Sequence, residues 1–562
     1  MLRLRAGLGK HPLICAAVAR RSHDHVPSAA SRGVPTRRRA TTHPTRPKHN
    51  NEGLRASTRE MSQMSGVSSP DPRVVETPFG RARHWIGHRD QVTGLRMTEH
   101  FCEVPLRYAL DGDGKASPST TTTTDTTTVV VFAREISSTK LSPKTVETLP
   151  YLVYLQGGPG FESPRPLETA GWFDKACESF RVLLLDQRGT GRSTPISSRS
   201  LAALGDPEAQ AAYLAHFRAD SIVRDAEVMR HCLQIDRWSI VGQSFGGFCA
   251  CSYLSLHPEG LREAFIMGGL PPTTRGSTAD DVYARLIKRV QLQNEKYYAR
   301  FPQDKAKVAD VMRYLLAKPE GVETPAGNTL TAPLLQTVGI RFGSAQGLEL
   351  VHWLFEDPWE EAGGGEGEEG EGGEKGGEGG RTLSYNFLKA FDGFLSFDTN
   401  VLYAVLHESI YVCGPGEASG WSAHRTREAH QSRACASFDA ARALDEGKPV
   451  YFTGEMIFPF MFDAIKSLRP LKACADIIAA KKDWGVLYDD DAMRANAWGV
   501  PVAAAVYVED MYVDFDLSRE TAEKLGARMF MTNEYVHSGI RENGPRILEK
   551  LYNMTRGVEC LR

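Results

Sequence analysis

Short, continuous apolar runs recur along the first half of the chain and again near its end, and each run closes in a turn or a glycine-rich loop. Such runs are typical of strands that are buried on both faces of a parallel sheet. Segments with apolar positions at helical spacing lie between them. The pattern predicts an α/β fold, a mostly parallel sheet flanked by helices, and its expected strands are 149–155, 181–185, 239–243, 261–267, 501–508 and 529–531.

The folded part is expected to begin near residues 74–83, to continue through a strand at 100–106 and to return at 129–134. Between the last two strands lies the threonine-rich segment 111–128, which predicts a surface hairpin loop because it has too little apolar area to order itself. Its start, Asp111-Gly112-Asp113-Gly114, resembles a calcium-binding loop. Thr122 occupies the position that requires a glutamate, so no metal is expected there.

The alternation of strands and helices stops near residue 273 and resumes near 499. We expect the segment 273–498 to be a helical cap inserted into an α/β core that consists of residues 71–272 and 499–562. The cap is predicted to contain amphipathic helices at 279–300, 305–316 and 387–411. Within it, residues 360–380 are almost entirely Gly and Glu, which predicts a disordered surface loop without chemistry. An acidic docking segment is the alternative.

The first fifty residues carry many arginines and lysines, and Asp24 is their only acidic residue. This bias is typical of a transit peptide for an organelle, so a mitochondrial or plastid location is one expectation for the chain. The alternative is a disordered tail over residues 1–70, with Met61 as the true start and a cytoplasmic location.

The overall composition excludes several classes of partner. A net charge of −2 provides no basic surface for nucleic acid, and no apolar run is long enough to cross a membrane. The ten cysteines lack metal-ligand spacing, so we expect reduced thiols, with Cys249 and Cys251 packed in the core. We expect no metal and no cofactor, and the sequence indicates no oligomeric state.

The strand at 239–243 runs into Gly242-Gln243-Ser244-Phe245-Gly246, a G-x-S-x-G sequence. The two glycines allow a strand and a helix to pass closely, while the serine sits at a strained turn with its hydroxyl exposed. A chance match is the alternative, because short patterns recur in unrelated chains. Helix-like segments at 221–235 and 248–257 complete the order helix, strand, turn, helix, so we predict that Ser244 is a nucleophile.

In hydrolases with this turn, an acid and then a histidine follow the serine, each in a loop after a strand. Asp510 and His537 have that order and placement. His537 is predicted to take the proton of Ser244 and return it to the leaving group, while Asp510 fixes the imidazole tautomer. Other acids near Asp510 compete for its role, first Asp514 and then Glu509 and Asp516.

Two glycine-rich loops follow the strands that precede Ser244. The first, Gln156-Gly157-Gly158-Pro159-Gly160, can direct backbone N–H groups at a developing negative charge and predicts an oxyanion hole, with an ordinary tight turn as the alternative. The second, 186–193, contains two arginines but lacks the lysine and spacing of a P-loop. Phosphate binding is therefore not expected.

The elbow G-Q-S-F-G-G, the loop G-G-P-G at 157–160 and the sequence D-Q-R-G-T-G-R-S at 186–193 together resemble the proline iminopeptidase (prolyl aminopeptidase) family of α/β-hydrolases. The resemblance covers about residues 80–560. It implies an α/β-hydrolase fold, release of N-terminal proline from short peptides through an acyl-enzyme on Ser244, and an oxyanion held by the N–H groups of Gly158 and Phe245. One position departs from the family, which usually has a histidine where Gln156 stands.

The resemblance also implies that carboxylates of the cap bind the charged amine of the substrate. The family has a glutamate before an aromatic-rich run, and the match at 451–459 makes Glu455 the candidate. An unpaired carboxylate among apolar groups is costly to bury, which favours an incoming ammonium. An internal salt bridge is the alternative. Glu408 is a second candidate, and an acid from 489–491 a third without support.

Two other functions remain open at this level. The same three catalytic residues serve esterases and amidases that act on small acyl substrates, because the fold alone does not select the substrate. The chain is alternatively a binding protein without catalysis on a hydrolase scaffold, which a complete serine, acid and histidine set argues against.

Overall fold

A computed structural model describes residues 72–108, 127–274, 276–361, 380–397, 399–416 and 418–558. The predicted tail at 1–70, most of the threonine-rich loop and most of the Gly/Glu segment lie outside the described residues. The described residues all belong to one compact unit, which spans Arg59–Arg562.

A ten-stranded sheet runs through this unit in the order β1-β2-β3-β4-β6-β5-β7-β8-β13-β14. β1 to β4 are antiparallel, β4 joins β6 in antiparallel register, and the remaining strands are parallel. The strands are β1 (Arg73–Thr77), β2 (Gly80–Val92), β3 (Leu95–Pro105), β4 (Thr128–Ser138), β5 (Tyr151–Leu155), β6 (Arg181–Asp186), β7 (Trp238–Gln243), β8 (Leu261–Met267), β13 (Val502–Tyr507) and β14 (Arg528–Thr532).

Every residue of the central strands β5, β7 and β13 is buried, as their continuous apolar sequences predict. Alternate residues of β5 belong to different hydrophobic cores, because they point to opposite faces of the sheet. Val153 joins the cluster that contains residues of α6 (Ala219–Cys232) and α7 (Phe245–Leu256), and Tyr154 joins the cluster that contains residues of α3 (Trp172–Cys177) and α20 (Gly539–Thr555). The helices outside the region between β8 and β13 are α2 (Pro143–Thr148), α3 (Trp172–Cys177), α4 (Ser198–Ala202), α5 (Pro207–Leu214), α6 (Ala219–Cys232), α7 (Phe245–Leu256), α19 (Phe515–Lys524) and α20 (Gly539–Thr555), with a 3-10 turn η1 (Pro258–Gly260).

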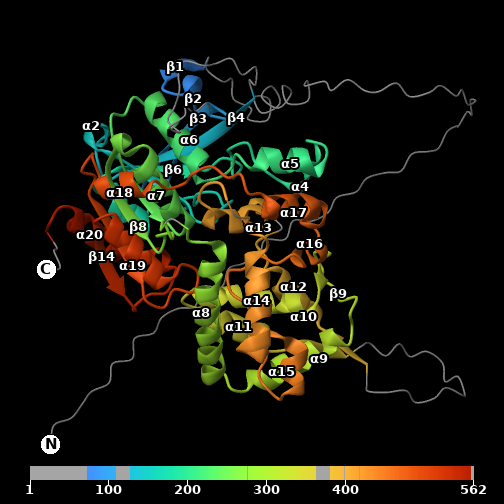
Figure 1. Ribbon diagram of the computed structural model, residues 1–562. Helices are drawn as coiled ribbons and strands as arrows, with labels where there is room; N and C mark the ends of the chain where they lie inside the picture. Colours follow the sequence, from blue (N-terminus) through green and yellow to red (C-terminus); the bar gives the residue numbers. More distant parts are fainter. Residues whose placement is uncertain are drawn as a thin grey trace, which may run out of the picture. The chain divides into compact units, whose positions relative to one another are not determined.

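The region between β8 and β13, which we call the helical insertion, is mainly helical (Figure 1). Two short hairpins interrupt it: β9 (Val322–Glu323) with β10 (Thr329–Leu330), and β11 (Trp359–Glu361) with β12 (Arg381–Leu383). Its helices are α8 (Ala279–Arg300), α9 (Asp304–Leu316), α10 (Ala332–Gln336), η2 (Thr337–Gly343), α11 (Gly347–Leu354), α12 (Tyr385–Asp392), α13 (Val401–Leu406), η3 (Glu408–Tyr411), α14 (Ser422–Arg433), η4 (Ala436–Phe438), α15 (Ala440–Asp445), α16 (Met461–Ala464), η5 (Arg469–Leu471), α17 (Lys472–Ala480) and α18 (Asp490–Ala495).

The predicted strands are all present, with small shifts at their ends, and the helices predicted at 279–300 and 305–316 match α8 and α9. The helix predicted at 387–411 is wrong. The chain forms α12, α13 and η3 in its place. Helix α12 ends at Asp392 with Gly393 as its C-cap, and Asn400, at φ −122° and ψ 64°, is the N-cap of α13.

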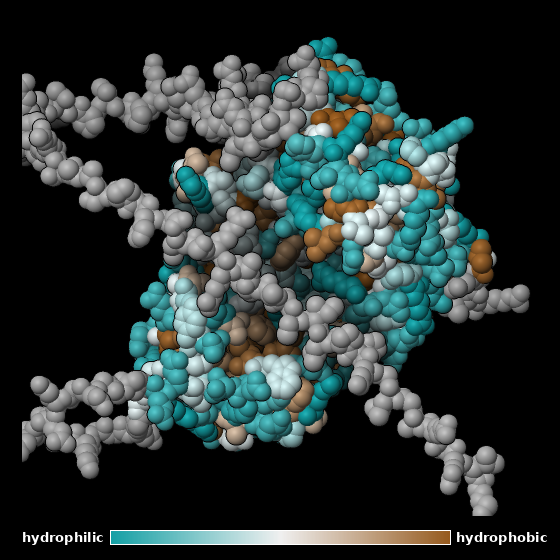
Figure 2. Space-filling view, turned by 180° about the vertical axis from the view of Figure 1, so that it is seen from behind, coloured by the Kyte–Doolittle hydropathy of each residue, from teal (hydrophilic) through white to brown (hydrophobic). Residues whose placement is uncertain are grey.

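Hydrophobic residues on the face seen in Figure 2 lie in separate patches on a mainly hydrophilic surface. Across the described ranges, every helix is too short or too polar to span a bilayer.

Candidate active site

Ser244 lies between β7 and α7 with a backbone φ of +55° and ψ of −128°. A residue with a side chain seldom adopts this conformation, so surrounding packing must hold it. Gly242 and Gly246 supply that packing: a Cβ at Gly242 would overlap the Gly246 carbonyl, and one at Gly246 would overlap the Leu155 carbonyl at the end of β5. The steric role predicted for the two glycines is thereby confirmed.

Asp510 lies in the loop after β13, and His537 lies in the loop between β14 and α20. The His537 Nδ1 donates to Asp510 Oδ2 at 2.8 Å, and both side chains are buried. The other oxygen of Asp510 accepts the backbone N–H groups of Tyr512 at 2.8 Å and Val513 at 3.1 Å. Burial alone would lower the pKa of His537, but the charge and hydrogen bond of Asp510 outweigh it and the pKa is raised.

Because Nδ1 donates to Asp510, the Nε2 atom of His537 is left as an acceptor. It lies 3.5 Å from Nε2 of Gln243, the last residue of β7 and the neighbour of Ser244. Between the described side chains of Ser244 and His537 themselves there is no hydrogen bond. The imidazole therefore lies at the serine turn, with its Nε2 atom directed toward the Gln243 amide at the end of β7.

Two of the acids that competed with Asp510 have other partners, and the third, Asp516, lies in the first turn of α19. Asp514 is the N-cap of α19 and accepts the N–H groups of Asp516 and Leu517. Glu509 forms a 2.6 Å ion pair with Lys296 of α8. Asp510 is thus the acid of this group that the structure brings to His537.

The loop that was predicted to form the oxyanion hole packs directly on Ser244. A Cβ at Gly157 would lie 2.9 Å from the Ser244 Cβ, and Gly158 has a φ of +134°, which favours glycine. Phe245 is the first residue of α7, so its N–H has no acceptor within the helix. The side chain of Gln156 accepts the Tyr154 hydroxyl at 2.8 Å.

Both arginines of the loop after β6 form ion pairs within the protein, and Arg192 pairs with Glu99 of β3. Arg188 is fully buried, and its Nε donates to Asp225 at 2.7 Å. Asp186 accepts both terminal nitrogens of Arg165 at 2.8 and 2.6 Å. These contacts hold the loop in place.

Glu455 lies in the segment between α15 and α16, and its Oε1 accepts the Tyr403 hydroxyl at 2.6 Å. Its side chain keeps part of its surface accessible. Burial raises the pKa of Glu455 to about 7, outweighing the nearby charge of His537 and the Tyr403 hydrogen bond, which lower it. Glu455 is thus a carboxylate without a basic side-chain partner among the described residues, within electrostatic reach of His537 and Asp510.

Glu408 has a different environment. Its two carboxylate oxygens accept the backbone N–H groups of Ser422 at 3.0 Å and Ala423 at 2.9 Å, at the start of α14. Both oxygens therefore serve the N-terminus of a helix. Among the acids at 489–491, Asp489 is the N-cap of α18 and Asp490 lies 3.2 Å from Lys524.

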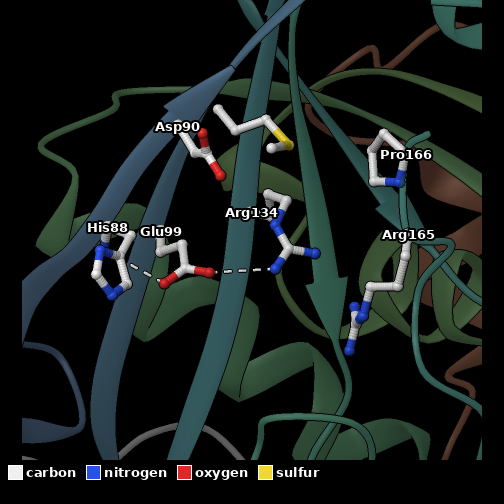
Figure 3. Close-up of a pocket in the computed structure, with 7 residues that line it drawn as sticks. His88, Asp90, Glu99, Arg134, Arg165 and Pro166 are labelled. Atoms are coloured by element: carbon white, nitrogen blue, oxygen red, sulfur yellow. Dashed lines mark hydrogen bonds and ion pairs between the residues drawn. The ribbon is translucent and has the colours of Figure 1, made fainter. Parts of the chain in front are cut away.

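A cavity of about 470 Å³ lies elsewhere, over β2, β3 and β4, and contains none of the predicted site residues (Figure 3). Both arginines of its lining form ion pairs: Arg134 pairs with Glu99, also in the lining, at 3.1 Å, and Arg165 pairs with Asp186 outside it. Its lining residues are His88, Asp90, Met97, Glu99, Arg134, Arg165 and Pro166.

Sequence reasoning missed Tyr512 and Tyr403. The Tyr512 ring contacts the His537 ring edge to face, with centroids 4.6 Å apart, and Tyr403 holds Glu455. The only signal for Tyr512 was its place two residues after Asp510, and Tyr403 lies in an apolar run that looks like ordinary helix core.

The fold is that of an α/β-hydrolase, and the family model for the alpha/beta hydrolase fold matches residues 150–315. A proline iminopeptidase of Aeromonas sobria is 43% identical over 82% of this chain and 97% of its own length. A second proline iminopeptidase, from Aspergillus aculeatus, is 34% identical over 81% of this chain and 93% of its own. The chain belongs to the proline iminopeptidase family.

Among solved structures, a proline iminopeptidase-related protein from Thermus thermophilus is similar to this chain. The match covers 76% of this chain and 94% of the Thermus chain. Its identity is 14% and its TM-score 0.31, values too low to bear on function.

Proposed function

We propose that this protein is a serine aminopeptidase that releases N-terminal proline from short peptides. The observation that carries the proposal is a half-buried carboxylate, Glu455, which has no basic side-chain partner among the described residues and lies within electrostatic reach of the Asp510–His537 pair at the Ser244 turn. The names of the two relatives support the same activity.

In the proposed reaction, His537 Nε2 takes the Ser244 proton as Oγ attacks the carbonyl carbon of the proline residue. The N–H groups of Gly158 and Phe245 hold the oxyanion. His537 then gives the proton to the leaving amine, the C–N bond breaks, and water hydrolyses the acyl-enzyme by the reverse roles. Catalytic hydrogen bonds often tighten only when substrate binds, so the unbound geometry of Ser244 and His537 is compatible with these steps.

The amine of the substrate is proposed to bind at Glu455. Desolvation makes the charged carboxylate unfavourable in the free protein, and an incoming ammonium at hydrogen-bond distance would relieve that cost. Glu408 is less suited to this role, because the N-terminus of α14 already uses both of its oxygens. We propose in addition that the helical insertion acts as the cap that carries this amine site.

Two measurements test the proposal. Glu455→Gln should lower kcat/KM for a prolyl arylamide by about 10²-fold, because loss of a buried charge partner costs about 2 to 5 kcal/mol, and should affect a neutral acetyl ester far less. Equal losses on both substrates would favour the general esterase or amidase. Ser244→Ala should abolish labelling by a fluorophosphonate, and an unlabelled parent protein would favour the non-catalytic binding protein.

For the basic segment at the N-terminus, we propose a transit function, supported by its arginine content and its scarcity of acids. Residues 1–70 fused to a fluorescent protein should direct it to an organelle. A diffuse cytoplasmic signal would contradict this proposal.

A further inference from the structure

Tyr512 joins the helical insertion to the acid and histidine. Its backbone N–H donates to Asp510 Oδ1 at 2.8 Å, and its ring meets the His537 ring edge to face at 4.6 Å. Its hydroxyl donates to the carbonyl of Ile340 in η2, on the insertion. One side chain therefore spans from the histidine to a cap element.

The turn η2 also contacts the segment that carries Glu455. A Cβ at Gly339 would overlap the Thr453 carbonyl, and the N–H of Thr453 donates to the Gln336 carbonyl at 2.8 Å. A Cβ at Gly343, in turn, would overlap the Tyr512 ring. The short turn η2 is thus in close contact with Tyr512 through Gly343 and with the Glu455 segment through Gly339.

A second contact joins the same two segments directly. A Cβ at Gly454 would lie 3.1 Å from the Met511 side chain, which is fully buried. The residue before Glu455 therefore packs on the residue before Tyr512. Interiors packed this closely transmit displacement instead of absorbing it.

We propose that Tyr512 is a positioning residue that, through η2, fixes the distance between the Glu455 carboxylate and the His537–Ser244 centre. The inference rests on the proposed function, in which Glu455 holds the amine. A fixed separation of amine site and reacting carbonyl admits a substrate whose amine and scissile bond belong to one residue. Because Tyr512 fixes this separation, it determines that cleavage occurs after a single N-terminal residue.

The test compares two substrates in variants that loosen this connection from either side. Tyr512→Phe removes the hydrogen bond to Ile340 and keeps the ring on His537. Gly343→Ala displaces the ring from the cap side. In each variant, the ratio of kcat/KM for a prolyl arylamide to that for p-nitrophenyl acetate should fall about three- to tenfold, the effect of one net hydrogen bond, chiefly through a higher KM for the arylamide.

Tyr297→Phe is the matched control. Tyr297 is buried and donates to Asp304 at 2.6 Å within the insertion. The substitution keeps the ring, which stacks on Phe342 of η2, and removes only this hydrogen bond, so it should lower the melting temperature without changing the contact between Tyr512 and η2. Its substrate ratio should equal that of the parent protein. If Gly343→Ala does not fold, the conservative Tyr512→Phe variant decides alone.

The outcomes separate the two proposals. A parent protein that cleaves the arylamide, with an unchanged ratio in Tyr512→Phe and Gly343→Ala, overturns the positioning role alone. A parent protein that cleaves the ester but not the arylamide overturns the aminopeptidase function and this inference with it. A fall in ratio that Tyr297→Phe reproduces would also reject the inference, since general loosening would explain it.

Discussion

At the scale of the single residue, Glu455 has the least ordinary environment. Its side chain is half-buried, and its carboxyl accepts one tyrosine hydroxyl and has a pKa raised by burial to about 7. The charged form is therefore held at a cost in the unbound protein, and two measurable effects follow from its titration.

The first effect is on activity. Between pH 5 and 7 the α-amino group of a substrate stays largely charged, while both His537 and Glu455 must lose a proton before they act as base and amine site. The logarithm of kcat/KM for a prolyl arylamide should therefore rise with a slope that exceeds one. A neutral ester, which needs only His537, should give a slope of one, as should the arylamide with Glu455→Gln. Identical slopes for both substrates in the parent protein would contradict the role of Glu455.

The second effect is on stability. The folded protein holds the Glu455 proton up to about pH 7, whereas the unfolded chain releases it near the ordinary value of 4.5. The folded state thus binds more protons in this window, and the free energy of unfolding falls as the pH rises through it. Glu455→Gln should be more stable than the parent at pH 8 by about 1–3 kcal/mol and nearly equal at pH 4. Urea denaturation at both pH values measures this, with the exposed Glu147→Gln in α2 as the control.

At the scale of the element, the loop after β6 depends on one ion pair that is removed from water. The side chains of Arg188 and Asp225 are 0% and 1% exposed, and Arg188 also donates to the carbonyls of Leu106 and His216. The pair connects β6 to α6 and to the end of β3.

Removing one partner of such a pair leaves an uncompensated buried charge. Arg188→Met should lower the free energy of unfolding by about 3–5 kcal/mol. Arg519→Met, which breaks an exposed pair with Glu523 in α19, should change it by under about 0.5 kcal/mol. Urea denaturation compares the two variants, and similar small losses would show that the buried pair adds little.

The elements also show how far sequence patterns reach. The central strands and the long helices α8 and α9 have continuous or strictly periodic apolar positions, so their positions follow from the sequence alone. The helix predicted at 387–411 failed because its pieces are each apolar on one face, and only tertiary packing turns the chain at Gly393 and Asn400. Short 3-10 turns such as η2 have no pattern at all.

The residues of the candidate site likewise include some that the sequence predicts and some that it does not. Ser244, Asp510 and His537 are predictable because each follows a recognisable strand in a fixed order. Glu455 was reached only through a family resemblance. Whether Glu408 caps a helix or faces a ligand depends on where Ser422 and Ala423 lie in space, and the linear sequence does not contain that information.

At the scale of the whole molecule, the hairpin of β11 and β12 brings Glu361 and Arg381 into register, so the two ends of the Gly/Glu segment meet. The part of the chain before this hairpin contains β8, and the part after it contains β13, which pairs with β8 in parallel. The sheet therefore joins the two parts without the segment between them.

Co-expressed fragments 59–361 and 380–562 should consequently purify together through a tag on one of them and hydrolyse the prolyl arylamide, because Ser244 lies in one fragment and Asp510 and His537 in the other. A break between Gln291 and Leu292, inside α8, should give no active complex, since it interrupts a continuous helix that packs on α14. Activity lost equally in both cases would show that the chain must be continuous at the hairpin.

The strand order has a bearing on synthesis. Strands β13 and β14, which position the acid and the imidazole, complete the edge of the sheet beside β8 and are made last. Ribosomes add about 5–20 residues per second, so the nascent chain carries its serine for on the order of ten seconds or more before a base can reach it. Under the proposed mechanism, an unfinished copy lacks its base and should leave neighbouring peptides intact, so hydrolysis should begin only when the final strands have docked.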